Sequence, residues 1–175
     1  MRPIGKAGMS LVETLFCIGI FILIMGACVG LLLRGWDSWQ SSSAQVQLAQ
    51  GLYRSVARMT NDIRQGGASV LANVPADNNP YPQISLPTAQ NVSGGNVVWG
   101  PLINYSLGGP GGKQLIRTQN SRISVIAVNI TSLQFFRHAS TPNVVNVQLT
   151  ASVPTYRGDQ QLTSTLSFDV LMRNS

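Results

Sequence analysis

The chain begins with the leader MRPIGKAG (residues 1–8), which is followed by MSLVETLFCIGIFILIMGACVGLLL (residues 9–33). This second run has 25 residues and only one charged side chain, that of Glu13. Because a helix rises about 1.5 Å per residue and the hydrocarbon core of a bilayer is about 30 Å thick, roughly 20 apolar residues can cross it. The run therefore predicts a transmembrane helix. An ionised carboxylate inside a membrane costs about 2.5 kcal/mol or more, so Glu13 should have a partner or a function there.

The position of the small residues sets this run apart from an ordinary secretory signal. Such a signal is cleaved after its apolar segment, at an A-x-A-like site, whereas Arg34-Gly35-Trp36-Asp37 follows the segment here. The hexapeptide Gly8-Met9-Ser10-Leu11-Val12-Glu13 resembles the type IV prepilin signature. In that family a prepilin peptidase cleaves after the glycine and methylates the new N-terminal residue, and glutamate is the fifth mature residue. The resemblance implies cleavage between Gly8 and Met9 and N-methylation of Met9, with methionine in place of the usual phenylalanine.

Charge pairing suggests a role for Glu13. Away from water its carboxylate would be offset by a cation, and the nearest one is the freed α-amine of Met9, in the same or a neighbouring subunit. Glu13 would then set the register of subunits during assembly. The alternative is that Glu13 simply reaches the lipid headgroups, since it lies near a helix end. Gly26 and Gly30 form a small-xxx-small pair that would allow close helix packing, although such a pair also arises by chance in membrane helices.

The residues after the apolar run predict a continuation of the same helix. Their apolar side chains recur mainly at spacings of three, four and seven, which indicates a helix with one face on a partner surface. Gly66-Gly67 is a helix stop, because glycine readily adopts the left-handed conformation. We expect one helix from Met9 to Gln65, transmembrane over residues 9–34 and amphipathic over 35–66. The predicted stripe consists of Trp36, Trp39, Val46, Ala49, Leu52, Tyr53, Val56, Met59 and Ile63.

The rest of the chain divides into a loop region and a β domain. Residues 67–96 are rich in turn-forming residues and predict a variable loop region with brief strands at Ser69–Leu71 and Gln83–Leu86. Residues 97–175 alternate apolar and polar side chains between short turns, which predicts an antiparallel sheet with one apolar face. The expected strands cover residues 97–107, 113–119, 124–128, 130–137, 143–152 and 160–171. The natural core is that face against the amphipathic half of the helix.

The order of these strands also resembles a family. The segments QLIR (114–117), ITSLQFF (130–136), VVNVQLT (144–150) and LTSTLSF (162–168) are similar to the J-type minor pseudopilins of type II secretion and to related minor pilins. The resemblance implies an α+β fold of the pilin-like lollipop type, with a long N-terminal helix packed on an antiparallel sheet domain. It implies a minor pilin or pseudopilin that forms, initiates or caps a type IV filament of a pilus, a type II secretion system or a DNA-uptake machine.

The expected partners and location follow from this interpretation. The partners are prepilin peptidase, the inner membrane, and other pilins or pseudopilins that contact the N-terminal helix. The mature chain would cross the inner membrane once, keep its C-terminal domain outside the cytoplasm, and enter a filament after assembly. The alternative is a ligand-binding pilin on the same scaffold, an adhesin or a DNA receptor, with residues 73–96 meeting the ligand.

Charge alone gives limited support to a nucleic-acid partner. The net charge is +6, from 12 basic and 6 acidic residues, and the leader contributes Arg2 and Lys6 to it. A basic face that contacts phosphates would need clustered arginines, whereas the candidates are spread along the helix and the strands, which favours an ordinary solvated surface. The candidates are Arg54, Arg58, Arg64, Arg117, Arg122, Arg137 and Arg157.

The sequence predicts neither an enzyme nor a cofactor or metal site. His138 is the only histidine, no Gly-x-Ser-x-Gly elbow is present, and a turn or surface role is expected for it. Asp77-Asn78-Asn79 resembles half of a calcium loop, but without a closing acidic residue it predicts a turn. Cys17 and Cys28 are eleven residues apart, about 16 Å along a helix, which is too far for a disulfide.

Overall fold

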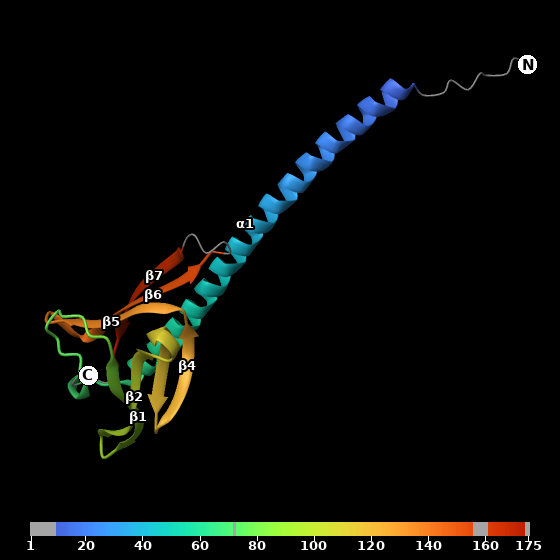
Figure 1. Ribbon diagram of the computed structural model, residues 1–175. Helices are drawn as coiled ribbons and strands as arrows, with labels where there is room; N and C mark the ends of the chain where they lie inside the picture. Colours follow the sequence, from blue (N-terminus) through green and yellow to red (C-terminus); the bar gives the residue numbers. More distant parts are fainter. Residues whose placement is uncertain (1–9, 72, 156–160, 174–175) are drawn as a thin grey trace, which may run out of the picture. The chain divides into compact units, whose positions relative to one another are not determined.

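A computed structural model describes residues 10–71, 73–155 and 161–173, and within them the chain is one long helix followed by antiparallel strands (Figure 1). This confirms the predicted α+β class. The chain divides into two compact units, residues 1–42 and residues 43–175, and the helix contributes to both. The elements are α1 (Leu11–Gln65), η1 (Ala68–Val70), β1 (Ile84–Ser93), β2 (Asn96–Gly108), η2 (Pro110–Gly112), β3 (Gln114–Gln119), β4 (Arg122–Val128), β5 (Ile130–His138), β6 (Thr141–Pro154) and β7 (Gln161–Leu171).

The strands form two antiparallel sheets in residues 43–175, with the orders β1-β2-β3-β4 and β5-β6-β7. Strand follows strand by tight turns because the turn residues accept positive φ. Gly94 and Gly95 (φ 58° and 82°) join β1 to β2, and Asn120 and Ser121 (φ 51° and 61°) join β3 to β4. The six strands predicted after residue 96 are confirmed, with boundaries that shift by at most two residues.

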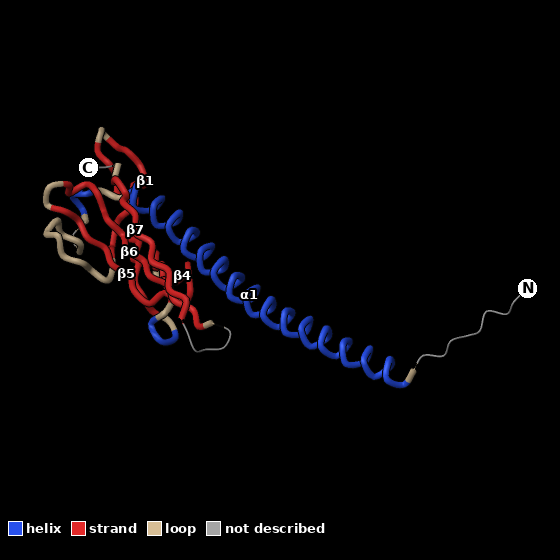
Figure 2. Tube along the Cα trace, turned by 90° about the horizontal axis from the view of Figure 1, so that it is seen from above, coloured by secondary structure: helices blue, strands red, loops and turns tan. Residues whose placement is uncertain are grey.

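The core of this unit lies between the sheets and residues 48–63 of α1. Leu52, Met59 and Ile63 of the helix are buried. The strands contribute alternate side chains, as a half-buried sheet requires, and Phe135 and Tyr105 are the largest of those that are fully buried. In the view of Figure 2 the strands gather along this part of the helix. The predicted core, sheet against amphipathic helix, is therefore confirmed.

The observed helix stripe differs from the predicted one. Val46 and Tyr53 are exposed, and the buried positions are Leu48, Leu52, Ser55, Met59, Asp62 and Ile63. The prediction chose positions by hydrophobicity alone and so passed over two polar residues. Both are satisfied where they lie: the hydroxyl of Ser55 donates to the carbonyl of Gly51 at 2.8 Å, and Asp62 accepts hydrogen bonds from the sheet.

The brief strand predicted at Gln83–Leu86 is present as the start of β1, but the prediction of loop over residues 87–93 is wrong. Residues 84–93 form the ten-residue strand β1, which pairs with β2 from Ile84↔Tyr105 to Ser93↔Asn96. Pro87 and the polar residues after it resemble a loop in the sequence, whereas β2 supplies the hydrogen bonds that hold them extended. The brief strand expected at Ser69–Leu71 is also wrong, because Ala68–Val70 is a 3-10 turn.

Candidate functional site

The first turn of α1 holds the charged residue of the apolar run. The carbonyl of Ser10 accepts hydrogen bonds from the amides of Glu13 (3.0 Å) and Thr14 (3.1 Å) and from the hydroxyl of Thr14 (3.2 Å). Glu13 therefore lies in the first helical turn, where the helix dipole stabilises a negative charge. Its side chain is exposed. The predicted cleavage and methylation sites, Gly8 and Met9, lie outside the described residues.

The surface of α1 from Leu11 to Leu33 is apolar on every side. Its large side chains are at least 48% exposed, and none is shielded by the rest of the described chain. A helix that is apolar all round belongs in lipid or among other apolar helices. Within the part of the chain that the structure describes, this is the one helix long and apolar enough to cross a membrane.

Three glycines leave bare patches on this surface. A Cβ added at Gly19, Gly26 or Gly30 would meet nothing within 4 Å, so the close-packing face predicted at Gly26 and Gly30 is accessible. A shallow apolar depression around Gly19, which had not been predicted from the sequence, lies on the same surface. It is lined by Val12, Leu15, Phe16, Gly19, Ile20 and Leu23. The three- and four-residue spacing of these positions was the available signal.

In the second unit a buried polar cluster joins the helix to the sheet. The hydroxyl of Tyr105 donates to Asp62 Oδ2 at 2.6 Å, and Arg117 Nε donates to the same oxygen at 2.7 Å. Arg117 also reaches Gln119 Oε1 at 2.8 Å. Arg58, four residues before Asp62 on the same helix, forms a longer ion pair with it, at 3.8 Å, and the Arg58 side chain is 53% exposed.

The protonation states in this cluster follow from its burial. Burial, followed by the hydrogen bond to Asp62, raises the pKa of Tyr105, so that its hydroxyl stays a donor. Burial is the largest single effect on the pKa of Arg117 and lowers it, but the hydrogen bond and charge of Asp62, together with the interaction with Tyr105, outweigh burial, so the pKa is raised. The cluster is thus a satisfied ion pair with a neutral tyrosine, and its chemistry is structural.

A second buried arginine holds the segment that follows the helix. Arg137, on β5, is 5% exposed, and its guanidinium donates only to backbone carbonyls. It reaches Pro142 at 2.5 and 2.8 Å and Val74 at 2.9 Å, with longer bonds to Ala68 and Leu71. Desolvation lowers the pKa of Arg137. Arg117 and Arg137 are therefore engaged internally rather than on a basic face, and Arg157 lies outside the described residues.

The segment at residues 77–81 forms a turn that hydrogen bonds to the Asp77 carboxylate hold together. Asp77 accepts hydrogen bonds from the Tyr81 hydroxyl (2.5 Å) and from the backbone (3.0 Å) and side-chain (2.9 Å) nitrogens of Asn79. His138 is exposed at the end of β5, where its Nδ1 lies 2.9 Å from Asn78 Oδ1. No cluster of three or more potential metal-ligating His, Cys, Asp or Glu side chains occurs among the described residues.

Comparisons with known proteins do not assign this chain to a family. No family model, no curated protein and no solved structure matches this chain. The described structure is nevertheless consistent with a pilin-like fold, because a long N-terminal apolar helix is followed by antiparallel sheets that pack on its second half. A single N-terminal helix that could span a membrane supports membrane anchoring.

Proposed function

We propose that the chain is a minor pilin or pseudopilin, a structural subunit that prepilin peptidase processes between Gly8 and Met9. The mature chain, N-methylated at Met9, resides in the inner membrane before assembly and then joins a type IV filament through its N-terminal helix. The observation that carries the proposal is the all-round apolar surface of Leu11–Leu33 with one carboxylate, Glu13, in its first turn. Such a surface suits lipid before assembly and neighbouring apolar helices afterwards.

The role of Glu13 in this proposal is electrostatic. In an environment without water the carboxylate is costly, and an α-amine from an adjacent subunit offsets its charge only when the two helices are in one register. The bare surfaces at Gly26 and Gly30 let helices approach in that register. The packing partner is thus another helix of the same kind, and the β domain is carried on the outside.

The first experiment determines the mature N-terminus. Intact mass and N-terminal sequencing are compared for protein from a host with its prepilin peptidase and from a peptidase-null strain. We expect a chain that begins at methylated Met9 only when the peptidase is present. An intact Met1 in both strains would overturn the proposal and leave a single-pass anchored β domain.

The second experiment separates processing from assembly. Glu13→Ala and Glu13→Gln should both be cleaved normally and both fail to enter filaments, because each removes the charge and Gln preserves the size. Thr14→Val is the matched control, since it alters the adjacent residue and keeps the charge. Wild-type incorporation of Glu13→Gln would show that charge pairing is not the role of this residue.

A further inference from the structure

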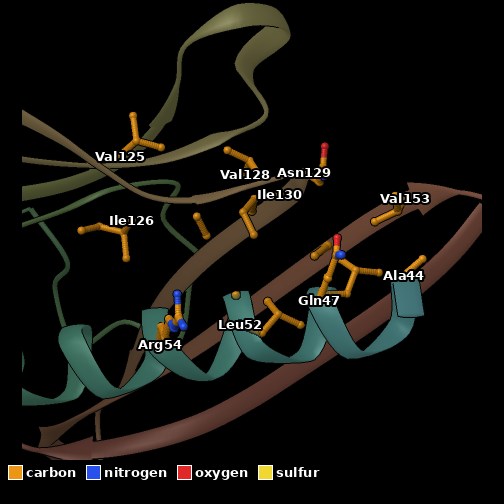
Figure 3. Close-up of a pocket in the computed structure, with 14 residues that line it drawn as sticks. Ala44, Gln47, Leu52, Arg54, Val125, Ile126, Val128, Asn129, Ile130 and Val153 are labelled. Carbon is orange, nitrogen blue, oxygen red and sulfur yellow. The ribbon is translucent and has the colours of Figure 1, made fainter. Parts of the chain in front are cut away.

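Strand β4 differs from the other sheet edges because its exposed side chains after Arg122 are apolar. Its pairing with β3 skips one residue: Leu115 pairs with Ala127 and Ile116 with Val125, so Ile126 is extra. A bulge of this kind re-phases the strand. Ala127 faces the core, while Ile123, Val125 and Val128 are exposed by 66%, 51% and 54%. Three β-branched side chains therefore line one face of an edge strand, and Figure 3 shows Val125 and Val128 directed away from the helix.

The other edges of the described sheets are protected in recognisable ways. Tyr81 forms an antiparallel bridge with Phe135, with backbone bonds of 2.7 and 2.8 Å, and so covers part of β5. Strand β1 contains Pro87 and two register irregularities, and both features discourage pairing. Strand β7 exposes a polar row, Thr163, Thr165, Ser167 and Asp169. Within the described residues, β4 pairs only with β3, and its protection is limited to one bulge and to Arg122 at its start.

A cleft of about 400 Å³ runs beside this edge. One wall is helix α1 from Ala44 to Arg54, and the other is the chain from Val125 to Ile130, with Ala151 and Val153 of β6 at one end (Figure 3). Gly51 leaves the helix wall open, since a Cβ there would meet nothing within 4 Å. A segment that paired with β4 would place alternate side chains in the cleft and alternate side chains beside Val125 and Val128.

The charge around the cleft indicates what kind of segment would bind there. Arg54 is the only charged residue among those lining the cleft, and it forms no ion pair with another described residue. Arg122 stands at the start of β4. Residues 43–175 hold nine basic and four acidic side chains, so a second copy would bring like charge to this site. An acidic segment of a different protein is favoured.

We propose that the β4 edge and its cleft bind an extended, apolar segment of a partner protein that carries an acidic residue opposite Arg54. The segment adds as a further strand beside β4, so backbone hydrogen bonds supply affinity and the cleft supplies specificity. The site lies within residues 43–175 and does not depend on the proposed filament function. Normal N-terminal processing with no binding at β4 would remove this inference and leave that function intact, and the converse also holds.

The test uses the full chain in detergent micelles and a fluorescent peptide, acetyl-Thr-Val-Asp-Val-Thr-Val-amide. We expect saturable binding by fluorescence anisotropy, weakened at least tenfold by Gly51→Phe, which fills the cleft from an open position. Gly35→Phe is the matched control, because Gly35 lies in the same helix and is equally unobstructed. Equal binding by both variants, or no binding by the wild type, would overturn the proposal.

A charge exchange tests the role of Arg54. Arg54→Glu should weaken binding of the Asp peptide about tenfold and improve binding of a peptide with Lys in that place. Arg64→Glu, ten residues further along α1, should change neither. If Arg54→Glu behaves like Arg64→Glu, charge does not select the occupant.

Two measurements identify a different occupant. Carbonyl ¹³C labels in the peptide report its conformation by infrared spectroscopy, and an extended amide I band is expected, which N-methylation of alternate amides should abolish along with binding. A helical band would show that the peptide docks as a helix, which would overturn the proposal of an added strand. A dimer of the chain in sedimentation, lost in Gly51→Phe, would assign the cleft to a second copy and overturn the acidic partner.

Discussion

The two halves of helix α1 share one secondary structure and differ in what their side chains contact. No side chain in the described residues 11–42 is buried, whereas Leu48, Leu52, Ser55, Met59, Asp62 and Ile63 are buried in the second half. The first half is apolar on all sides from Leu11 to Leu33, where Glu13 is the single charge, and the second half is apolar mainly on one face. Helical periodicity alone therefore does not distinguish a segment made for lipid or other helices from one made for its own sheet; the width of the apolar surface does.

The largest expected effect comes from placing a charge in each half. Met59→Asp puts an unpaired carboxylate at a fully buried position, which should lower the free energy of unfolding by about 5 kcal/mol. Leu23→Asp should leave the unfolding of the β domain unchanged and weaken membrane insertion by about 3 kcal/mol. Urea denaturation and a membrane-extraction assay measure the two. Destabilisation of the β domain by Leu23→Asp would contradict the comparison.

The second-largest effect is expected at the buried polar cluster around Asp62, which lies in the second half of the helix. Asp62→Ala leaves Arg117 and Tyr105 without their acceptor, so we expect a loss of about 3–5 kcal/mol in unfolding free energy. Arg58→Ala, which removes the exposed and longer contact to the same carboxylate, should cost less than about 1 kcal/mol. Similar losses in the two variants would show that Arg117 is not the principal partner of Asp62.

A smaller effect is expected from Tyr105→Phe, about 1.5–3 kcal/mol, because one hydrogen bond to a charged group is lost. Burial and the bond to Asp62 raise the pKa of Tyr105 above its ordinary value of 10.0. The associated stability is thus present below about pH 10 and is lost as the pH rises toward the folded-state pKa. Urea midpoints from pH 8 to 11 should fall steeply for the wild type and less for Tyr105→Phe. Parallel curves would contradict this assignment.

The smallest effect concerns the exposed turn at Asp77. The hydrogen bond from Tyr81, followed by those from Asn79, lowers the pKa of this carboxyl from 3.8. Its contribution is therefore present above about pH 3.8 and is lost as the pH falls through the folded-state pKa. We expect faster exchange of the Asn79 amide at low pH, relative to its intrinsic rate at the same pH, with no change in global unfolding. Asp77→Ala should show the fast exchange already at neutral pH.

Much of this fold could be predicted from local sequence. The apolar run with Glu13, the stop at Gly66-Gly67 and the strands after residue 96 all carry short-range signals, and the structure agrees with each one that it describes. Only the start of β1, at Gln83–Leu86, could be predicted, because the residues that follow favour turns and are held extended by hydrogen bonds to β2.

The buried polar contacts were beyond local reasoning for a similar reason. Asp62 and Arg117 are 55 residues apart, and Arg137 binds carbonyls whose positions exist only once the chain is folded. The apolar face of β4 likewise depends on a bulge in its pairing with β3. At the N-terminus it is the sequence alone that carries the information. The motif predicts a processing site between Gly8 and Met9, and both residues lie outside the described part of the chain.

The hydrogen bonds from Arg137 to backbone carbonyls affect which changes in sequence this protein can tolerate. The Arg137 guanidinium donates to the carbonyls of Ala68, Leu71, Val74 and Pro142 and to no side chain among the described residues. Every amino acid has a carbonyl, so this contact places no demand on the identity of those four residues. The exposed positions of the segment between the helix and β1 can therefore diversify while Arg137 and the Tyr81–Phe135 bridge keep its backbone in place, which allows new specificities to arise without a new fold.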